Sequence, residues 1–228
     1  GFYGITDAQR VNRYAKILEQ AFDGKPLTVR QEQPIDTALF KARITQWKLP
    51  GALIAHDVEY HLADGKFYTV DQGKDLIYIT DPRTNQTETF TIPNGGIPVG
   101  GKFLKVFNNP NPFSLAVSRG PHSLQEGPDG KFYTTDTVSG QIGVFDPATR
   151  TYTGHDIGGK AMYPHTIRFD RKGMAWFTLG VSNQVGRFNP GTGEMTLMDL
   201  PATSDRPEIP AYLAYGILSG HFRRKLLP

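Results

Sequence analysis

Between residues 43 and 201, apolar and polar residues alternate in short stretches, and glycine or proline ends most of them. An alternation with period two predicts β-strands that bury one face. Each unit of this pattern contains an aromatic strand, which begins at Phe67, Phe132 or Trp176. An Asp-Gly or Lys-Gly turn precedes this strand, and an alternating strand that ends at Asp-Pro or Asn-Pro follows it. With one strand before and one after, each unit is predicted to have four strands.

The pattern recurs at a fixed interval. His122 and His165 are 43 residues apart, and so are Gly130 and Gly173. Gly65 precedes Gly130 by 65 residues, which is one repeat plus an insertion of about 22 residues at 94–118. A repeat of about 40 to 45 residues is typical of β-propellers, in which each blade is a four-stranded sheet.

We therefore predict an all-β fold, a partial β-propeller with about three full four-stranded blades. The blades span about 52–93, 119–159 and 160–201, and residues 43–49 are predicted to form one further outer strand. Residues 43–201 are then the propeller region. Three blades do not close a ring, since closed propellers have about four to eight. A longer polypeptide completes the ring, which is the arrangement we favour, or another chain does so, or the arc stays open.

Two segments without the repeat flank the propeller region. Residues 6–23 have apolar side chains at helical spacing, so residues 1–42 are predicted to hold an N-terminal α-helix and a linker. We expect this helix or another polypeptide to cover the exposed faces of the end blades. Residues 202–228 are an inter-blade insertion or tail with a short apolar stretch and a basic end. We favour a helix packed on the propeller rim over membrane contact through 209–225.

Composition narrows the function classes. The formal net charge is +3, but lysine and arginine are spread along the chain, so nucleic acid is not an expected partner. The chain has no cysteine, which excludes disulfides, Cys-based zinc sites and c-type haem within it. The glycine-rich stretch 95–101 lacks phosphate-loop spacing. We expect neither haem nor a nucleotide.

The third repeat carries the most specific motif. Residues 164–201 read Pro-His-x-Ile, Gly-x-x-Trp-Phe-Thr, Asn-x-Val-Gly-x-Phe-x-Pro-x-Thr-Gly and Leu-Pro, in that order. This pattern resembles the repeat of the virginiamycin B lyase (streptogramin lyase) family of β-propellers. The resemblance covers about 43–201 and is strongest in the second and third repeats. The NHL and gluconolactonase-like propellers are weaker matches.

The resemblance implies more than a fold. It implies a seven-bladed ring and an Mg²⁺-dependent lyase that opens a cyclic depsipeptide antibiotic by C–O elimination, with a histidine and carboxylates near the axis. It also implies an exported protein, periplasmic or extracellular. Blades of this family often end their aromatic strand in Trp-Phe-Thr-Glu. The equivalent residues here are Asp71, Asp136 and Leu179, so two blades keep a carboxylate as a candidate metal ligand and the third has lost it.

One histidine recurs at the start of the innermost strand of each blade: His56, His122 and His165. Innermost strands surround the axis of a propeller, so equivalent residues should converge there. Three imidazoles at one mouth are candidate catalytic residues, as general bases, or metal ligands. The alternative is structural, since a duplicated histidine can bond the backbone between blades. Aspartates at strand ends, such as Asp71 and Asp136, can likewise bond turn amides.

Three functions remain open from the sequence. The first is a streptogramin lyase-like propeller that binds a small ligand at the axial mouth, with metal-assisted C–O elimination as the activity implied by resemblance. The second is a non-catalytic propeller that serves as a scaffold or protein-binding subunit of a larger assembly. The third is a lactonase-type hydrolase with Ca²⁺ at the axis. The partner is accordingly a small molecule or another polypeptide that completes the propeller, and the sequence does not name the substrate.

Overall fold

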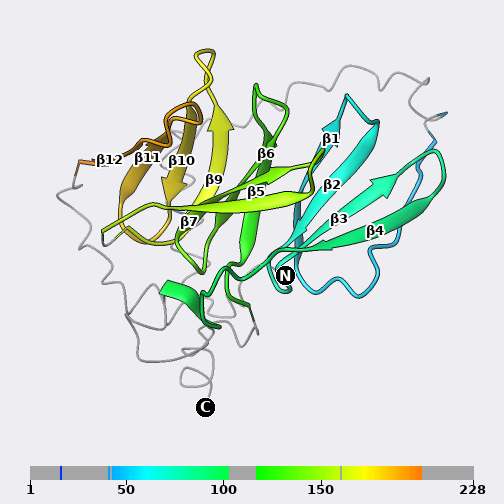
Figure 1. Ribbon diagram of the computed structural model, residues 1–228, viewed down its shortest axis with the longest axis horizontal. Helices are drawn as coiled ribbons and strands as arrows, with labels where there is room; N and C mark the ends of the chain where they lie inside the picture. Colours follow the sequence, from blue (N-terminus) through cyan, green and yellow to red (C-terminus); the bar gives the residue numbers. More distant parts are fainter. Residues whose placement is uncertain (1–15, 17–40, 42, 103–116, 160, 202–228) are drawn as a thin grey trace. The chain divides into compact units, whose positions relative to one another are not determined.

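The part of the chain that the structure describes folds into twelve β-strands, which form three four-stranded antiparallel sheets (Figure 1). The structure, a computed structural model, describes residues 16, 41, 43–102, 117–159 and 161–201. All twelve strands lie in a compact unit that begins at Trp47. No helix in the described ranges is long and apolar enough to cross a membrane.

Each sheet is one predicted repeat, so the four-stranded blade is confirmed. Blade 1 contains β1 (Ala55–His61), β2 (Lys66–Asp71), β3 (Leu76–Asp81) and β4 (Gln86–Thr91). Blade 2 contains β5 (Pro121–Glu126), β6 (Phe132–Asp136), β7 (Gln141–Asp146) and β8 (Thr151–Asp156). Blade 3 contains β9 (Pro164–Phe169), β10 (Ala175–Leu179), β11 (Gln184–Phe188) and β12 (Met195–Asp199).

The hairpin turns repeat in backbone conformation as well as in sequence. At the turn between the second and third strands, Asp75, Gly140 and Asn183 have φ of 51°, 69° and 51°. A left-handed residue closes a tight hairpin, and glycine, asparagine and aspartate adopt this conformation at least cost. The other two turns of each blade follow the same rule, with positive φ at Gly65, Gly130 and Gly173 and at Asn85, Arg150 and Gly193.

Consecutive blades bury their apolar faces against each other. Ile92 of blade 1 and Leu124 of blade 2 belong to one buried cluster, and Ile157 of blade 2 and Ile167 of blade 3 belong to the next. The strands β1, β5 and β9 are neighbours across these junctions. They are the first strand of each blade, so the junctions bring the starts of the three repeats together.

Residues 43–49 form no strand, which corrects the prediction of a further outer strand there. From Trp47 onward this segment contacts side chains of blade 1: the Trp47 ring lies 5.5 Å from that of Phe67, and its indole N–H donates to Asn85 at 3.0 Å. The Tyr78 hydroxyl also lies 3.3 Å from the carbonyl oxygen of Pro50. A strand needs a neighbouring strand edge for its backbone bonds, and contacts with side chains supply none.

Several predicted segments lie outside the described residues. These are the helix at 6–23 and the linker at 24–42, apart from Lys16 and Lys41, and the tail at 202–228. The insertion at 94–118 is described only at its two ends.

Candidate functional site: a column of three histidines

Each of the three recurring histidines lies at an irregularity in the first strand of its blade. In blade 1, Ala55 pairs with Asp71 and Val58 with Thr69, so the ladder shifts register around His56. The pairing of β5 with β6 and of β9 with β10 shifts at the same place. An extra residue in one strand re-aims the neighbouring side chains. The repeat therefore encodes the same local bend three times, with a histidine in each.

The three rings form a column across the two blade junctions. The ring centroids of His56 and His122 are 3.7 Å apart, and those of His122 and His165 are 4.0 Å apart. The interplanar angles of 37° and 42° describe tilted stacking. The structure thus brings together the three histidines that the sequence singled out, although it leaves their chemical role a prediction.

All three rings use the same nitrogen to contact the protein. Nδ1 of His56 lies 3.1 Å from the Asp57 carboxylate, and Nδ1 of His122 donates to the His165 carbonyl at 3.2 Å. Nδ1 of His165 lies 3.0 Å from the Thr166 hydroxyl. Among the described residues, no hydrogen-bond partner contacts Nε2 of any of the three rings. A ligand would therefore meet the Nε2 atoms.

Two of the three rings, His122 and His165, have a lowered pKa, which favours their neutral form. Burial lowers the pKa of His122 to about 4, and the neighbouring His165 and His56 contribute to the shift. Burial also lowers the pKa of His165. Charging two neighbouring rings of the stack would place like charges against each other, which is unfavourable. A neutral imidazole with its proton on Nδ1 offers Nε2 as a hydrogen-bond acceptor.

The residue after each histidine is a second part of the site, and the sequence reading missed it. Asp57 accepts hydrogen bonds from the Ser123 hydroxyl at 2.7 Å and from the Leu124 amide at 3.3 Å. Ser123 in turn accepts from the Ile167 amide at 3.4 Å. Burial acts to raise the pKa of Asp57, but bonds from Ser123 and His56 outweigh it and lower the pKa. The signal was available, because Asp57, Ser123 and Thr166 are polar at the same repeat position.

The two predicted metal ligands are engaged elsewhere in their blades. Asp71 is fully buried, and its carboxylate accepts from the amides of Leu53, Ile54 and Gly73 at 2.8 to 2.9 Å. Asp136 is also fully buried and accepts from the hydroxyls of Tyr152 and Thr134 at 2.7 and 2.8 Å. The Asp71 bonds to loop amides are those that the structural alternative predicts. Burial raises the pKa of Asp136, against the lowering effect of its hydrogen bonds.

From blade to blade, the residue at the position of these aspartates changes together with the residues that donate hydrogen bonds to it. The Tyr78 hydroxyl of β3 donates to Asp71 at 3.3 Å. Blade 2 has Gly143 at the position of Tyr78, and a Cβ there would collide with the Tyr152 hydroxyl, which reaches Asp136 from β8 instead. Blade 3 has a leucine in place of the aspartate and a glycine in place of Tyr78. The carboxylate therefore occurs only in the two blades in which a tyrosine hydroxyl donates a hydrogen bond to it. This indicates that it stabilises its own blade.

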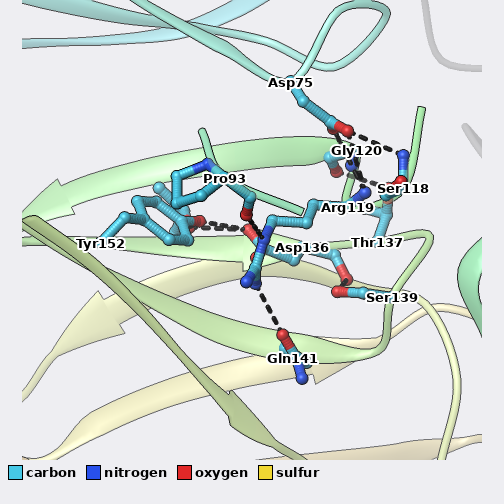
Figure 2. Close-up of polar contacts among 11 residues, drawn as sticks. Asp75, Pro93, Ser118, Arg119, Gly120, Asp136, Thr137, Ser139, Gln141 and Tyr152 are labelled. Carbon is cyan, nitrogen blue, oxygen red and sulfur yellow. Dashed lines mark hydrogen bonds and ion pairs between the residues drawn. The ribbon is translucent and has the colours of Figure 1, made fainter. Parts of the chain in front are cut away.

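Asp136 has one further partner, Arg119, which Figure 2 shows reaching toward both Asp136 and Gln141. Its guanidinium lies 3.2 Å from the Asp136 carboxylate and 2.7 Å from the Gln141 amide oxygen, and it donates to the Pro93 carbonyl at 2.7 Å. On the other side of this segment, the Asp75 carboxylate of blade 1 accepts from the amides of Ser118, Arg119 and Gly120 (Figure 2). This cluster joins blade 1 to blade 2.

A divalent ion does not fit the described residues. Mg²⁺ needs several oxygen ligands, and the Asp71 and Asp136 carboxylates are already bonded to the protein. No group of three or more candidate ligands lies together in the described ranges.

The fold and the histidine column define a β-propeller with a candidate polar site at its blade junctions, and solved structures show the same fold. Virginiamycin B lyase from Staphylococcus aureus, solved as a catalytically inactive histidine-to-alanine variant with quinupristin, matches at 20% identity and a TM-score of 0.55. The match covers 71% of this chain and 47% of that one. The selenomethionine-substituted lyase from the same organism matches at 20% identity and a TM-score of 0.56, with 73% and 48% covered. A streptogramin B lyase structure matches at 17% and 0.56, with 72% and 46% covered.

These likenesses show the fold, which is part of a virginiamycin B lyase-like β-propeller. The chain spans slightly less than half the length of each of these proteins. No family model matches the chain, and no curated protein matches it.

Proposed function

We propose that these blades form the ligand-binding part of a β-propeller, and that the histidine column accepts hydrogen bonds from a small polar ligand at the propeller axis. The single observation that carries the proposal is the shared orientation of the rings, each of which uses Nδ1 for the protein and leaves Nε2 for a ligand. Three Nε2 acceptors in a row suit a ligand with several N–H or O–H groups, such as a cyclic peptide.

Within the column, we assign proton transfer to His56. The Asp57 carboxylate holds its Nδ1–H, an arrangement that fixes the tautomer and stabilises the imidazolium when Nε2 takes a proton. The side chain of His56 is 38% exposed, whereas His122 is buried and difficult to protonate. His122 and His165 then form the wall on which His56 stacks.

The reaction class that suits this base is β-elimination of an ester. The base removes a proton from the carbon next to the one that bears the ester oxygen, the electrons of that C–H bond form a double bond between these two carbons, and the alkyl C–O bond breaks to release the acyl group as a carboxylate. The carboxylate is a good leaving group and needs little acid assistance. A catalytic histidine in the S. aureus lyase, which the inactive histidine variant indicates for that protein, supports this choice.

Quinupristin is the probe for both parts of the proposal. We expect the ring signals of His56 to shift in NMR spectra when quinupristin is added, and slow opening of the antibiotic to a linear product of unchanged mass. A product heavier by one water would indicate hydrolysis instead. Binding should weaken as the pH falls toward 4, because protonated imidazole no longer accepts a hydrogen bond.

Variants test whether the histidine column is a ligand-binding site or only a packing arrangement of three rings. His56→Ala should abolish the product, and Asp57→Asn should retain the shift of the His56 signals but slow the product at least tenfold. His155→Asn is the matched control, since His155 packs on Phe188 away from the column, with ring centroids 4.8 Å apart. Unchanged histidine signals at millimolar quinupristin would refute binding of this ligand class, and a His56→Ala variant with full activity would refute the assigned base.

A second candidate function, a protein-binding propeller, is favoured by a different surface. Val58, Tyr60 and Leu62, at and next to β1, are exposed apolar residues. Single exposed apolar residues are common, but a group on one strand and its turn marks a surface for another protein.

A further inference from the structure

One residue of blade 3, Tyr163, has a backbone conformation that is unusual for its side chain. The carbonyls of Ile54, Gly120 and Tyr163 accept from an amide of their own blade at 2.9, 2.9 and 3.0 Å, so these residues share one repeat position, two residues before each histidine. Gly120 and Tyr163 both have a left-handed backbone there, with φ of 65° and 60°. Glycine adopts this conformation freely, whereas a bulky side chain is strained in it. Blade 3 therefore keeps a tyrosine where glycine would avoid the strain.

The neighbouring strand end of blade 3 makes room for the tyrosine ring. The amides that donate to these three carbonyls belong to Gln72, Thr137 and Gly180, which share a second repeat position. A Cβ at Gly180 would lie 3.2 Å from Cδ1 of Tyr163, which is a tight contact. Blade 2 has the opposite arrangement, since a Cβ at Gly120 would lie 3.0 Å from the Thr137 hydroxyl. The two positions differ between the blades in a complementary way, which indicates that the tyrosine ring has a fixed place.

That place is beside the histidine column. The ring centroid of Tyr163 lies 5.8 Å from that of His165 and 6.4 Å from that of His122. The tyrosine is buried, and it belongs to one apolar cluster with Val138 of blade 2. The ring therefore contacts the column in blade 3 and also packs across the junction with blade 2.

A side chain of blade 1 holds the tyrosine as well. Gln72 donates to the Thr137 hydroxyl of blade 2 at 3.0 Å, and its side chain also forms a hydrogen bond with the Tyr163 hydroxyl. Gln72 is 9% exposed, so both bonds are shielded from water. Buried polar networks rigidify the structure around them. One amide thus connects the three blades next to the histidine column, with the tyrosine ring between them.

We propose that Tyr163 is a positioning residue of the histidine site, whose ring fixes the His165 and His122 imidazoles so that Nε2 meets the ligand. His165 has the weaker polar anchor, because its Nδ1 contacts the hydroxyl of the adjacent Thr166, whereas Nδ1 of His122 donates to a backbone carbonyl. Groups that bind a ligand need packed neighbours to hold them in place. Strained backbone conformations also cluster at functional sites. The ligand rests on the proposed function, but the support of the rings by Tyr163 does not.

Histidine NMR titrations without a ligand test this inference. Burial lowers the pKa of both His165 and His122. Tyr163→Leu removes the ring and admits water, so both pKa values should rise by about half a pH unit or more. The charged groups that act on the two rings, Asp57 and His56, are the same in this variant, so a rise reports access of water. Tyr163→Phe keeps the ring and should titrate like the wild type.

Two further variants separate positioning from a general loss of stability. Tyr133→Leu is the matched control, because Tyr133 is another buried tyrosine and its ring lies against Phe169 and Phe188. It should leave the titrations of the two histidines unchanged. Tyr163→Gly adopts the left-handed turn without strain, as Gly120 does in blade 2, so it should fold and raise both pKa values as Tyr163→Leu does.

Quinupristin separates this inference from the proposed function. If the wild type binds it, Tyr163→Leu should weaken binding at least tenfold, and Tyr163→Phe should bind nearly as tightly as the wild type. If the wild type does not bind it, the proposed function fails for this ligand class, and the titrations alone decide the role of the ring. Titrations that Tyr163→Leu and Tyr163→Gly both leave unchanged would overturn the inference. So would equal shifts in Tyr133→Leu, or a Tyr163→Leu variant that binds quinupristin as tightly as the wild type.

Discussion

The carboxylate of Asp75 offers the sharpest test of how the blades are joined. It lies in the β2–β3 turn of blade 1 and accepts from three consecutive amides at the start of blade 2, those of Ser118 at 2.7 Å, Arg119 at 3.2 Å and Gly120 at 2.7 Å. Replacement by glycine removes the carboxylate but keeps the turn, because Gly140 occupies this position in blade 2 with the same sign of φ.

The expected cost follows from these bonds. A hydrogen bond to a charged group contributes about 1.5 to 3 kcal/mol. The site is partly buried, so water can replace some of the lost bonding, and we take the lower value for the two short bonds. Glycine also has two opposite effects on stability, each of about 1 kcal/mol, which cancel. It makes the unfolded chain more flexible, which is destabilising, and it relieves the strain of a left-handed aspartate in the folded state. Asp75→Gly should therefore lower the free energy of unfolding by about 3 kcal/mol.

Urea unfolding followed by tryptophan fluorescence measures this quantity. Asn183→Gly is the matched control: Asn183 has the same φ of 51° in blade 3, and its side chain donates only to the Leu200 carbonyl at 3.3 Å. We expect it to change stability by less than about 1 kcal/mol. Asp75→Asn keeps one acceptor oxygen and should fall between the two. If Asp75→Gly costs no more than Asn183→Gly, the carboxylate does not join the blades.

Three further predictions use the same unfolding assay. Leu124→Ala should cost about 3 kcal/mol and Val58→Ala less than about 1, since the first side chain is buried and the second exposed at one repeat position; equal costs would contradict the junction. Gly143→Ala should cost about 3 kcal/mol, because its Cβ would collide with Tyr152 and Thr134 and displace the hydroxyl that serves Asp136; a neutral result would place Tyr152 elsewhere. The pKa of His122 is lowered to about 4 in the folded state, so the unfolded chain binds more protons between pH 6.5 and 4, and stability should fall by about 3 kcal/mol across that window. His122→Phe should remove much of this slope, and a wild-type protein equally stable at pH 7 and 4 would show that the ring is not buried.

The blade architecture was predictable because several independent sequence signals indicate it in each repeat. Strand alternation, glycine turns and Asp-Pro corners agree with one another at three places, and an offset kept at each landmark leaves little room for another fold. The strand expected at 43–49 fails for the opposite reason. Its alternation satisfies a local rule, but Trp47 contacts Phe67 and Asn85, and no neighbouring edge is there to pair with it.

The candidate site was predictable in position but not in detail. The recurrence of His56, His122 and His165 was sufficient to place them together, because equivalent positions in a propeller meet at the junctions. Their tautomers were not predictable, since these depend on contacts such as the His165 carbonyl that reaches His122 from the next blade. The sequence shows Asp57 only as a polar residue. Its role follows from the structure, in which the Ser123 hydroxyl of the next blade donates to it at 2.7 Å.

The three blades also show which repeat positions are constrained by their neighbours. The position after the histidine holds Asp57, Ser123 and Thr166, which differ in size and charge but all carry an oxygen that can accept the amide of the next blade. The position that ends the second strand holds Asp71, Asp136 and Leu179. Each aspartate accepts a hydrogen bond from a tyrosine of its own blade, Tyr78 or Tyr152, and the blade with the leucine has a glycine at the position of Tyr78. A position that faces a neighbouring blade must keep its chemistry, because both sides would have to change together. A position that faces its own sheet can change with one partner, so the recurrence of a carboxylate there indicates shared packing before it indicates a shared metal site.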